Sequence, residues 1–340
     1  MAIISSNYSI PMKGNGAYNA HSELQREALI EALPLLRTAT LKATQNSLST
    51  NTNILRVIEY GASHGANSWQ DNMDKTQYPH KIFVSSIPRS FYEPLNATRD
   101  LDVGYCFTCL HYLEEIPNYP GCHFTAVHSS ETTSKLRAQA QTDLQKFLQL
   151  RASEFVPGGQ LVLSLLATGF DNPDFMNSGL RNAMQSAMSQ MFLEGKLSQE
   201  AIEACVLPVY YRTTEDIQAT LATEEVIRQW TVVKIEQSQV IHPFWKELEF
   251  QKEQELYTEE HSIAYAKAMV SWFWAAFEGF ALRAIIGTQP HDPEESIQNL
   301  LEEMKEKAIR VFLEKYKDNP VYMSSVFVHL EAKVSVGGSS

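Results

Sequence analysis

The sequence predicts an α/β fold with a parallel sheet and a helical cap, and three observations support this prediction. Short apolar runs that suit buried strands alternate with helical patterns in the first half of the chain. A turn of small residues, Gly61–Gly65, directly follows the first of these runs. Beyond about Asn172 the patterns are mainly helical until an apolar stretch near the end. The expected division is a core of residues 1–170 and 318–336 and a mainly helical cap of residues 171–317.

Each element is predicted from its own local pattern. Apolar side chains at helical spacing predict the first helix, with an apolar face made of Leu24, Ala28, Leu29, Leu33 and Leu36. Apolar, β-branched runs bounded by glycine, proline or polar turns predict the strands. In chain order the predicted elements are helix 20–37, strands 54–60, 81–87 and 101–110, helix 132–151, strand 160–166, helices 178–195, 198–205 and 214–221, strand 231–236, helices 261–286 and 293–317, and strand 320–334.

Composition and charge exclude several classes of protein. The 340 residues include 28 Lys and Arg against 40 Asp and Glu, and the net charge of -12 opposes binding to nucleic acid or to an anionic membrane surface. The most apolar stretch, Ile263–Gly287, contains charged side chains and therefore predicts a buried or groove-lining helix, not a membrane span. Four cysteines without a recognisable signal peptide predict reduced thiols. We expect a cytoplasmic protein, monomeric or homodimeric, that acts on a small molecule.

The turn after the first strand is the first candidate functional feature. The strand ends in an acid, Glu59, and continues into a Gly-x-x-x-Gly turn, which brings backbone N–H groups close to a cofactor. The same turn also matches the Gly-x-Ser-x-Gly pattern of serine hydrolases. That alternative is disfavoured because only one predicted strand precedes the turn, and because no Asp-then-His order stands out downstream.

The spacing of several cysteines and histidines raises a metal site as one further alternative. Cys106, Cys109 and His111, with Cys122 and His123 beyond them, are ligand types at a spacing compatible with zinc. Cys106 and Cys109 sit at the end of an apolar strand, however, and this position counts against a zinc site. We therefore predict no metal site.

Several motifs, in order over most of the chain, carry a family resemblance. A Gly-rich segment, Met12–Gly16, leads into the Tyr-x-x-x-Ser-x-x-Gln pattern of Tyr18–Gln25. The further matching motifs are Ile58–Ser68, Arg89–Leu95, Leu110–Leu113 with Ile116-Pro117, Gln141–Leu166, Glu194–Leu197 and Leu207–Tyr210. Together they resemble the SABATH family of S-adenosylmethionine-dependent carboxyl methyltransferases.

The resemblance implies a shortened Rossmann-like class I methyltransferase sheet with a helical cap, and S-adenosylmethionine as the cofactor. The cofactor contacts that it implies come from Tyr18, Ser22, Glu59, Gly61, Asn67, Ser90 and Phe91. The acceptor carboxylate would be held by Gln25 and Tyr112, with His111 beside them, and these three form the implied catalytic set. The acceptor wall would include Trp272 and Phe273, next to Trp274 and Phe277, although at least half of these aromatics are expected to be plain core.

The implied reaction is methylation of the carboxylate of a small hydrophobic acid. A carboxylic acid with a pKa of about 4 is already an ionised nucleophile at pH 7. The protein therefore needs to align oxygen, methyl and sulfur and to exclude water, without a general base or a metal.

The chain departs from the family pattern at the cofactor site. Only Gln70–Ile82 stands where the family carries a helix, a strand ending in a ribose-binding Asp, and a second helix. In an alternative alignment Ser86 takes the position of that Asp. Glu59 replaces an Asp, and Tyr112 replaces a Trp. We therefore expect weak or lost cofactor binding, and a sheet with fewer strands in which residues 54–60 are central.

These departures leave a second function open. The chain would then be a SABATH-fold protein that no longer uses S-adenosylmethionine and that binds or converts a small molecule without methyl transfer. Such a protein would be a cyclase, an isomerase or a pseudoenzyme.

Overall fold

The computed structural model describes most of the chain, namely residues 22–49, 54–61, 85, 87–117, 130–168, 178–289 and 293–334. The helices among these residues are α1 Glu23–Ser49, α2 Ser130–Ala152, α3 Ser178–Leu193, α4 Gln199–Ala204, α5 Thr214–Leu221, α6 Glu224–Gln229, α7 Pro243–Glu253, α8 Glu259–Thr288 and α9 Glu294–Lys315. The strands are β1 Val57–Glu59, β2 Leu101–Phe107, β3 Phe155–Leu166, β4 Trp230–Ile241 and β5 Tyr322–Ala332.

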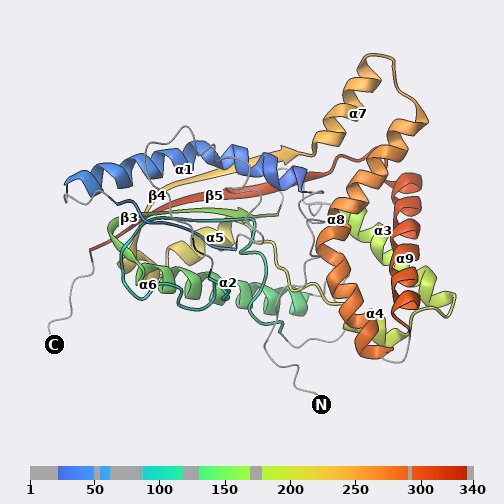
Figure 1. Ribbon diagram of the computed structural model, residues 1–340, viewed down its shortest axis with the longest axis horizontal. Helices are drawn as coiled ribbons and strands as arrows, with labels where there is room; N and C mark the ends of the chain where they lie inside the picture. The colour runs from blue at the N-terminus through green and yellow to red at the C-terminus, as the bar shows by residue number, and fades with distance from the viewer. Residues whose placement is uncertain are drawn as a thin grey trace.

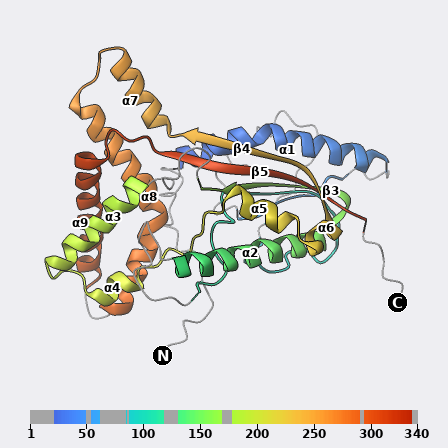
Figure 2. The ribbon, with the colours of Figure 1, turned by 180° about the vertical axis from the view of Figure 1, so that it is seen from behind.

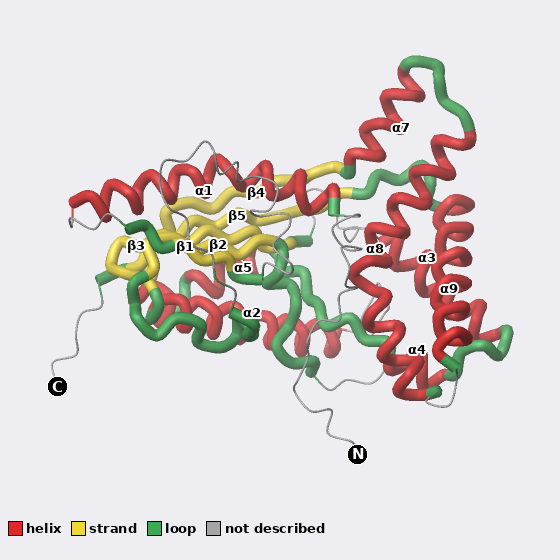
Figure 3. The backbone as a smooth tube through the Cα atoms, viewed as in Figure 1, coloured by secondary structure: helices red, strands yellow, loops and turns green. Residues whose placement is uncertain are grey.

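A mixed sheet forms the centre of the core (Figure 3), with the strand order β1-β2-β3-β5-β4 among the described residues. β1, β2 and β3 run parallel, whereas β5 is antiparallel to both of its neighbours, β3 and β4. The fold is α/β, as predicted.

Helices cover both faces of the sheet, α1 on one side and α2, α5 and α6 on the other (Figures 1 and 2). The alternation of side chains along the strands explains the two layers. Val162 of β3 joins Ala32 and Leu35 of α1 in one apolar cluster. Its neighbour Leu161 joins Phe147 of α2 in another. Consecutive residues of β3 thus face opposite helical layers, and the central strands β3 and β5 are largely buried between these layers.

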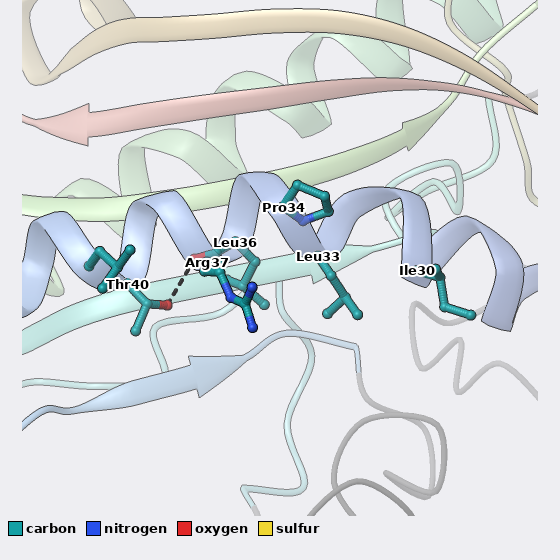
Figure 4. Close-up of a pocket in the computed structure, with 7 residues that line it drawn as sticks. Ile30, Leu33, Pro34, Leu36, Arg37 and Thr40 are labelled. Atoms are coloured by element: carbon teal, nitrogen blue, oxygen red, sulfur yellow. Dashed lines mark hydrogen bonds between the residues drawn. The ribbon is translucent and has the colours of Figure 1, made fainter.

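The long helix α1 buries one face against the sheet. Leu24, Ala28, Ala32, Leu35 and Ala39 recur at three- and four-residue spacing and are at most 7% exposed. The predicted face included Leu33, and this was wrong because Leu33 is 45% exposed. The outer face of α1 carries a groove of about 630 Å³ that is lined by seven of its own residues, six of which Figure 4 labels. None of the predicted site residues that the structure describes lines this groove.

A helical region lies beside one end of the sheet and contains α3, α4, α8 and α9 (Figure 1). It is held by one apolar cluster, to which α8 contributes Tyr265, Met269 and Phe277. By length and composition α8 could cross a membrane, but 67% of its most apolar window is buried in this fold. It is therefore a buried core helix here, as the sequence predicted.

Three features of the fold differ from the expectations. Residues 54–60 were expected at the centre of the sheet, and this was wrong: among the described residues β1 is an edge strand, with Val57 51% exposed. β4 lies within the range predicted for the cap but is the opposite edge strand of the sheet. The helices α6 and α7 were not predicted. The division into core and cap otherwise stays a prediction.

Candidate active site

The predicted site residues gather where the parallel strands end. Glu59 is the last residue of β1, and the segment Leu110–Leu113 follows β2. Because parallel strands end at one edge of a sheet, these segments approach each other there. Among the described residues, the segment before β2 supplies Ser90 and Phe91, the residue before α1 and the first turn of α1 supply Ser22 and Gln25, and α8 supplies Trp272 and Phe273.

The turn after β1 is shaped by backbone geometry and by close packing. Gly61 has a φ of +78°, and a Cβ at this position would lie 2.6 Å from the Cys109 sulfur. Both observations explain a glycine here without a ligand. The same Cβ position lies 3.7 Å from the Phe91 ring, so the turn and the predicted adenine-stacking residue are neighbours. The Glu59 carboxylate accepts a hydrogen bond from the Tyr105 hydroxyl at 3.2 Å.

The segment that carries Ser90 and Phe91 is anchored by a fully buried ion pair. Arg151 and Glu154 are both 0% exposed, and their side chains approach to 2.9 Å. Arg151 also donates to the backbone oxygens of Phe91 at 2.9 Å and Glu93 at 2.8 Å. The Glu154 carboxylate accepts from backbone N–H groups farther along the same segment. The ion pair therefore fixes the course of the chain beside the Gly61 turn.

On the acceptor side, His111 and Tyr112 lie together in the segment after β2. Their ring centroids are 4.3 Å apart, and His111 stacks on Tyr211 at 5.6 Å with an interplanar angle of 9°. The Tyr112 carbonyl accepts from the Tyr92 hydroxyl at 2.8 Å, and Arg212 donates to the Leu110 carbonyl. These contacts hold the aromatic pair in one orientation.

The surroundings of His111 are apolar but electropositive. Burial, and the positive charges of Arg212 and then Arg181, lower the pKa of His111 to about 3. Its Nδ1 is buried and has no hydrogen-bond partner in the described structure. Arg181 is itself 9% exposed and lies with its guanidinium 5.2 Å from the Tyr211 ring centroid. His111 is thus a neutral ring at pH 7 in a region of positive potential.

The predicted substrate residue Gln25 forms a hydrogen bond with Trp272, which was predicted in the acceptor wall. The indole Nε1 of Trp272 donates to Gln25 Oε1 at 2.8 Å, across 247 residues of sequence. Phe273 lies on the same helix, with its ring centroid 6.1 Å from that of Phe277. Tyr211, which stacks on His111, packs against the apolar cluster that contains Trp272 and Phe273. The two groups of acceptor residues are therefore connected through Tyr211.

Of the other predicted residues, the structure describes Ser22 and Ser90 but not Tyr18 and Asn67. Ser22 is buried just before α1, with 2% exposure. Ser90 is exposed, and its hydroxyl accepts from the Tyr92 N–H at 3.1 Å. Tyr18 and Asn67 lie outside the described residues, as does the predicted strand 81–87 for the most part. Of the weighed zinc ligands, Cys109 donates its thiol to the carbonyls of Gly61 and Phe107.

Sequence reasoning missed several residues of the site, chiefly Arg181, Tyr211 and Arg212. Tyr211 directly follows a motif, Leu207–Tyr210, that the family resemblance singled out, so a signal for it was present. Arg181 and Arg212 gave no such signal, because a buried arginine looks like a surface arginine in sequence.

The fold is that of a class I methyltransferase. The solved structure of a loganic acid methyltransferase with SAH matches this chain with a TM-score of 0.65 at 16% identity, covering 96% of this chain and 100% of that one. This likeness concerns the fold alone, and the sequence comparisons go further.

The chain belongs to the SAM-dependent carboxyl methyltransferase family, the SABATH family, whose model matches residues 68–330. Methyltransferase LUC1 of Fusarium sp is 32% identical over 361 residues, covering 95% of this chain and 97% of the relative. O-methyltransferase acrG of Aspergillus aculeatus is 32% identical over 373 residues, covering 98% and 99%. Both alignments are longer than the 340 residues of this chain, so parts of the relatives have no counterpart here.

The protein is accordingly an S-adenosylmethionine-dependent methyltransferase, and the alternative without cofactor use is not supported. The described residues fit the cofactor, because Glu59 and Gly61 at the end of β1 and Phe91 from the segment before β2 meet at one end of the sheet, with Phe91 beside the Gly61 turn. Glu59 and the Gly61 turn would hold the methionine and adenosyl part, and Phe91 would stack on adenine. When bound, S-adenosylmethionine supplies an electrophilic methyl group. The weak affinity expected from the shortened segment stays a prediction.

Proposed function

We propose that this enzyme transfers the methyl group to the carboxylate of a small hydrophobic acid and forms a methyl ester. The observation that carries the proposal is the hydrogen bond between Trp272 and Gln25. An indole N–H can only donate, so it fixes the Gln25 amide with its oxygen towards Trp272 and its NH₂ group on the other side. A carboxylate, which only accepts hydrogen bonds when ionised, suits a donor presented in this way.

Electrostatics around His111 support an anionic acceptor. Arg181 and Arg212 are buried, and their charges help to lower the pKa of the neighbouring His111. A positive potential that repels a proton from an imidazole attracts a carboxylate. An amine acceptor, whose nitrogen gains positive charge as an ammonium centre during transfer, gains nothing from the same potential.

The roles of the residues follow from this arrangement. Gln25 donates to one carboxylate oxygen, and the ring of Tyr112, held by its neighbours, orients the acceptor against the cofactor side. Neutral His111 fills the wall beside it. Trp272 and Phe273 cover the apolar body of the acid and exclude water. Because the nucleophile is already ionised, alignment supplies the catalysis.

The names of relatives that match part of the chain agree with this chemistry. They include a jasmonate O-methyltransferase of Arabidopsis thaliana, 30% identical over 159 residues, with 42% of this chain and 41% of that protein covered. An indole-3-acetate O-methyltransferase of the same plant is 29% identical over 149 residues, with 40% and 39% covered. Both names state an organic acid as the acceptor.

The test uses sets of compounds with one skeleton and three end groups: carboxylic acid, primary amide and alcohol. The purified enzyme is incubated with each compound and methyl-labelled S-adenosylmethionine. We expect label in the products of acids only. Transfer to the amide or alcohol at a rate equal to that of the acid would contradict the proposal.

A further inference from the structure

His242 is a buried histidine next to the proposed acceptor site that the family motifs do not include. It is the single residue between β4 and α7, and it is 1% exposed. Its ring lies edge-on to Trp272, with 6.2 Å between the centroids and an interplanar angle of 77°. Trp272 is the residue that orients Gln25. His242 and Gln25 therefore both contact the indole of Trp272.

The protonation of His242 follows from its contacts. Its Nδ1 accepts a hydrogen bond from the Phe244 N–H at 3.3 Å and so caps the start of α7. Burial lowers the pKa of His242 to about 4, so the ring is neutral at pH 7. A neutral imidazole whose Nδ1 accepts must carry its proton on Nε2. The helix cap thus fixes Nε2 as a donor.

This donor is without a partner. His242 Nε2 is buried and makes no hydrogen bond within the part of the chain that the structure describes. A buried N–H group that lacks an acceptor destabilises the folded state. Such a cost is tolerated where a ligand supplies the missing oxygen, and the ring contact with Trp272 connects His242 to the proposed acceptor site.

We propose that His242 determines acceptor specificity by donating from Nε2 to a second oxygen, a carbonyl or a hydroxyl, on the body of the acid. This inference rests on the proposed function. It narrows the acceptor class from hydrophobic acids in general to acids that carry an oxo or hydroxy group beyond the carboxylate. Gln25 binds the carboxylate, and His242, which contacts the same indole ring of Trp272, binds the second oxygen.

The test compares matched acids in the wild type and in His242→Asn. Each pair differs by a single oxygen, such as levulinate against pentanoate and hydroxyphenylacetates against phenylacetate, with the oxygen at successive positions. Asparagine is a favourable N-cap residue, so the variant keeps the acceptor for the Phe244 N–H and loses only the distal donor. Its thermal unfolding is measured in parallel to verify that it folds.

In the wild type we expect kcat/KM for at least one oxygenated acid to exceed that of its parent by about tenfold, the value of one hydrogen bond. In His242→Asn this preference disappears, while the KM for S-adenosylmethionine is unchanged. Equal use of both members of every pair by the wild type would overturn the inference, as would a preference that survives in His242→Asn.

A second measurement separates this inference from the proposed function. The ring nitrogens of His242 are followed by ¹⁵N NMR while the same acids are added to the wild-type enzyme. We expect the Nε2–H signal to move with an oxygenated acid and not with its parent. If no acid is methylated, the proposed function fails, and the NMR result alone decides the role of His242: no movement with any acid overturns it.

Discussion

The buried ion pair between Arg151 and Glu154 gives the sharpest stability prediction, tested by Glu154→Gln. The Glu154 carboxylate accepts from Arg151 Nη2 and the Tyr60 hydroxyl, both at 2.9 Å, and from the backbone N–H groups of Leu95 at 2.7 Å and Asn96 at 3.2 Å. The substitution leaves the guanidinium of Arg151 buried without its counter-charge. Removing one partner of such a pair costs about 3–5 kcal/mol.

The assay is urea unfolding at pH 7, with S-adenosylmethionine calorimetry on the same samples. We expect the free energy of unfolding to fall by about 3–5 kcal/mol, a large share of the roughly 5–15 kcal/mol that native proteins possess. Cofactor affinity should fall as well, because Arg151 also holds the carbonyl of Phe91 at 2.9 Å.

Glu114→Gln is the matched control. Glu114 pairs with Lys146 at 2.6 Å, but the two side chains are 30% and 43% exposed. An exposed pair contributes about 0–1 kcal/mol. If Glu154→Gln and Glu114→Gln lower the free energy of unfolding equally, this would refute the reasoning that burial makes loss of the Arg151–Glu154 pair more costly.

Three further predictions follow from the site. Gln25→Ala should weaken binding of the acid, not of the cofactor, by about 1–3 kcal/mol, measured from the KM of each; an unchanged KM for the acid would count against Gln25 as the carboxylate ligand. Trp272→Phe removes the donor that orients Gln25 and should raise the KM for the acid about three- to tenfold, whereas the same change at Trp274 should leave this orientation intact; equal effects at both positions would indicate general packing. Lowering the pH from 7 to 5 should destabilise the protein by about 2 kcal/mol for each of His111 and His242, because their pKa values, about 3 and about 4 in the fold, lie below the ordinary value of 6.5. As the pH falls, the unfolded chain binds protons at these histidines and the folded state does not. Their contribution to stability is therefore present above about pH 6.5 and is lost as the pH falls towards 4. A loss of unfolding free energy in His242→Asn as large as in the wild type would contradict this.

Much of the fold could be predicted because its elements are locally encoded. The helix over 214–221 and the strand ends near 166 and 334 lie at or close to their predicted positions. Two missed helices also had readable signals: α7 starts with a proline after its cap, and α6 starts with Glu224 and Glu225. These were errors of interpretation, not limits of the sequence.

The order of the strands could not be read in the same way. β1 was expected at the centre of a sheet with fewer strands than the family norm. Pairing depends on distant segments, and among the described residues nothing pairs with the outer side of β1. The side chain of Val57 in β1 is accordingly exposed.

In the site, too, local motifs predicted which residues take part, whereas contacts between distant segments set their orientation. Motifs predicted Gln25, His111 and Tyr112 as members, but not how they are oriented. The orientation of Gln25 comes from Trp272, far away in the sequence, and the charge around His111 comes from two buried arginines. Long-range contacts of this kind leave no periodic pattern in the sequence.

Alkali treatment of the labelled product tests the central claim, carboxyl methylation with S-adenosylmethionine, most directly. The enzyme is incubated with methyl-labelled S-adenosylmethionine and an acid that it accepts, and the isolated product is then exposed to mild base. A methyl ester releases its label as methanol, whereas a methyl ether or an N-methyl product keeps it. We predict complete release of the label. Label that stays with the product after this treatment would contradict methylation of a carboxylate.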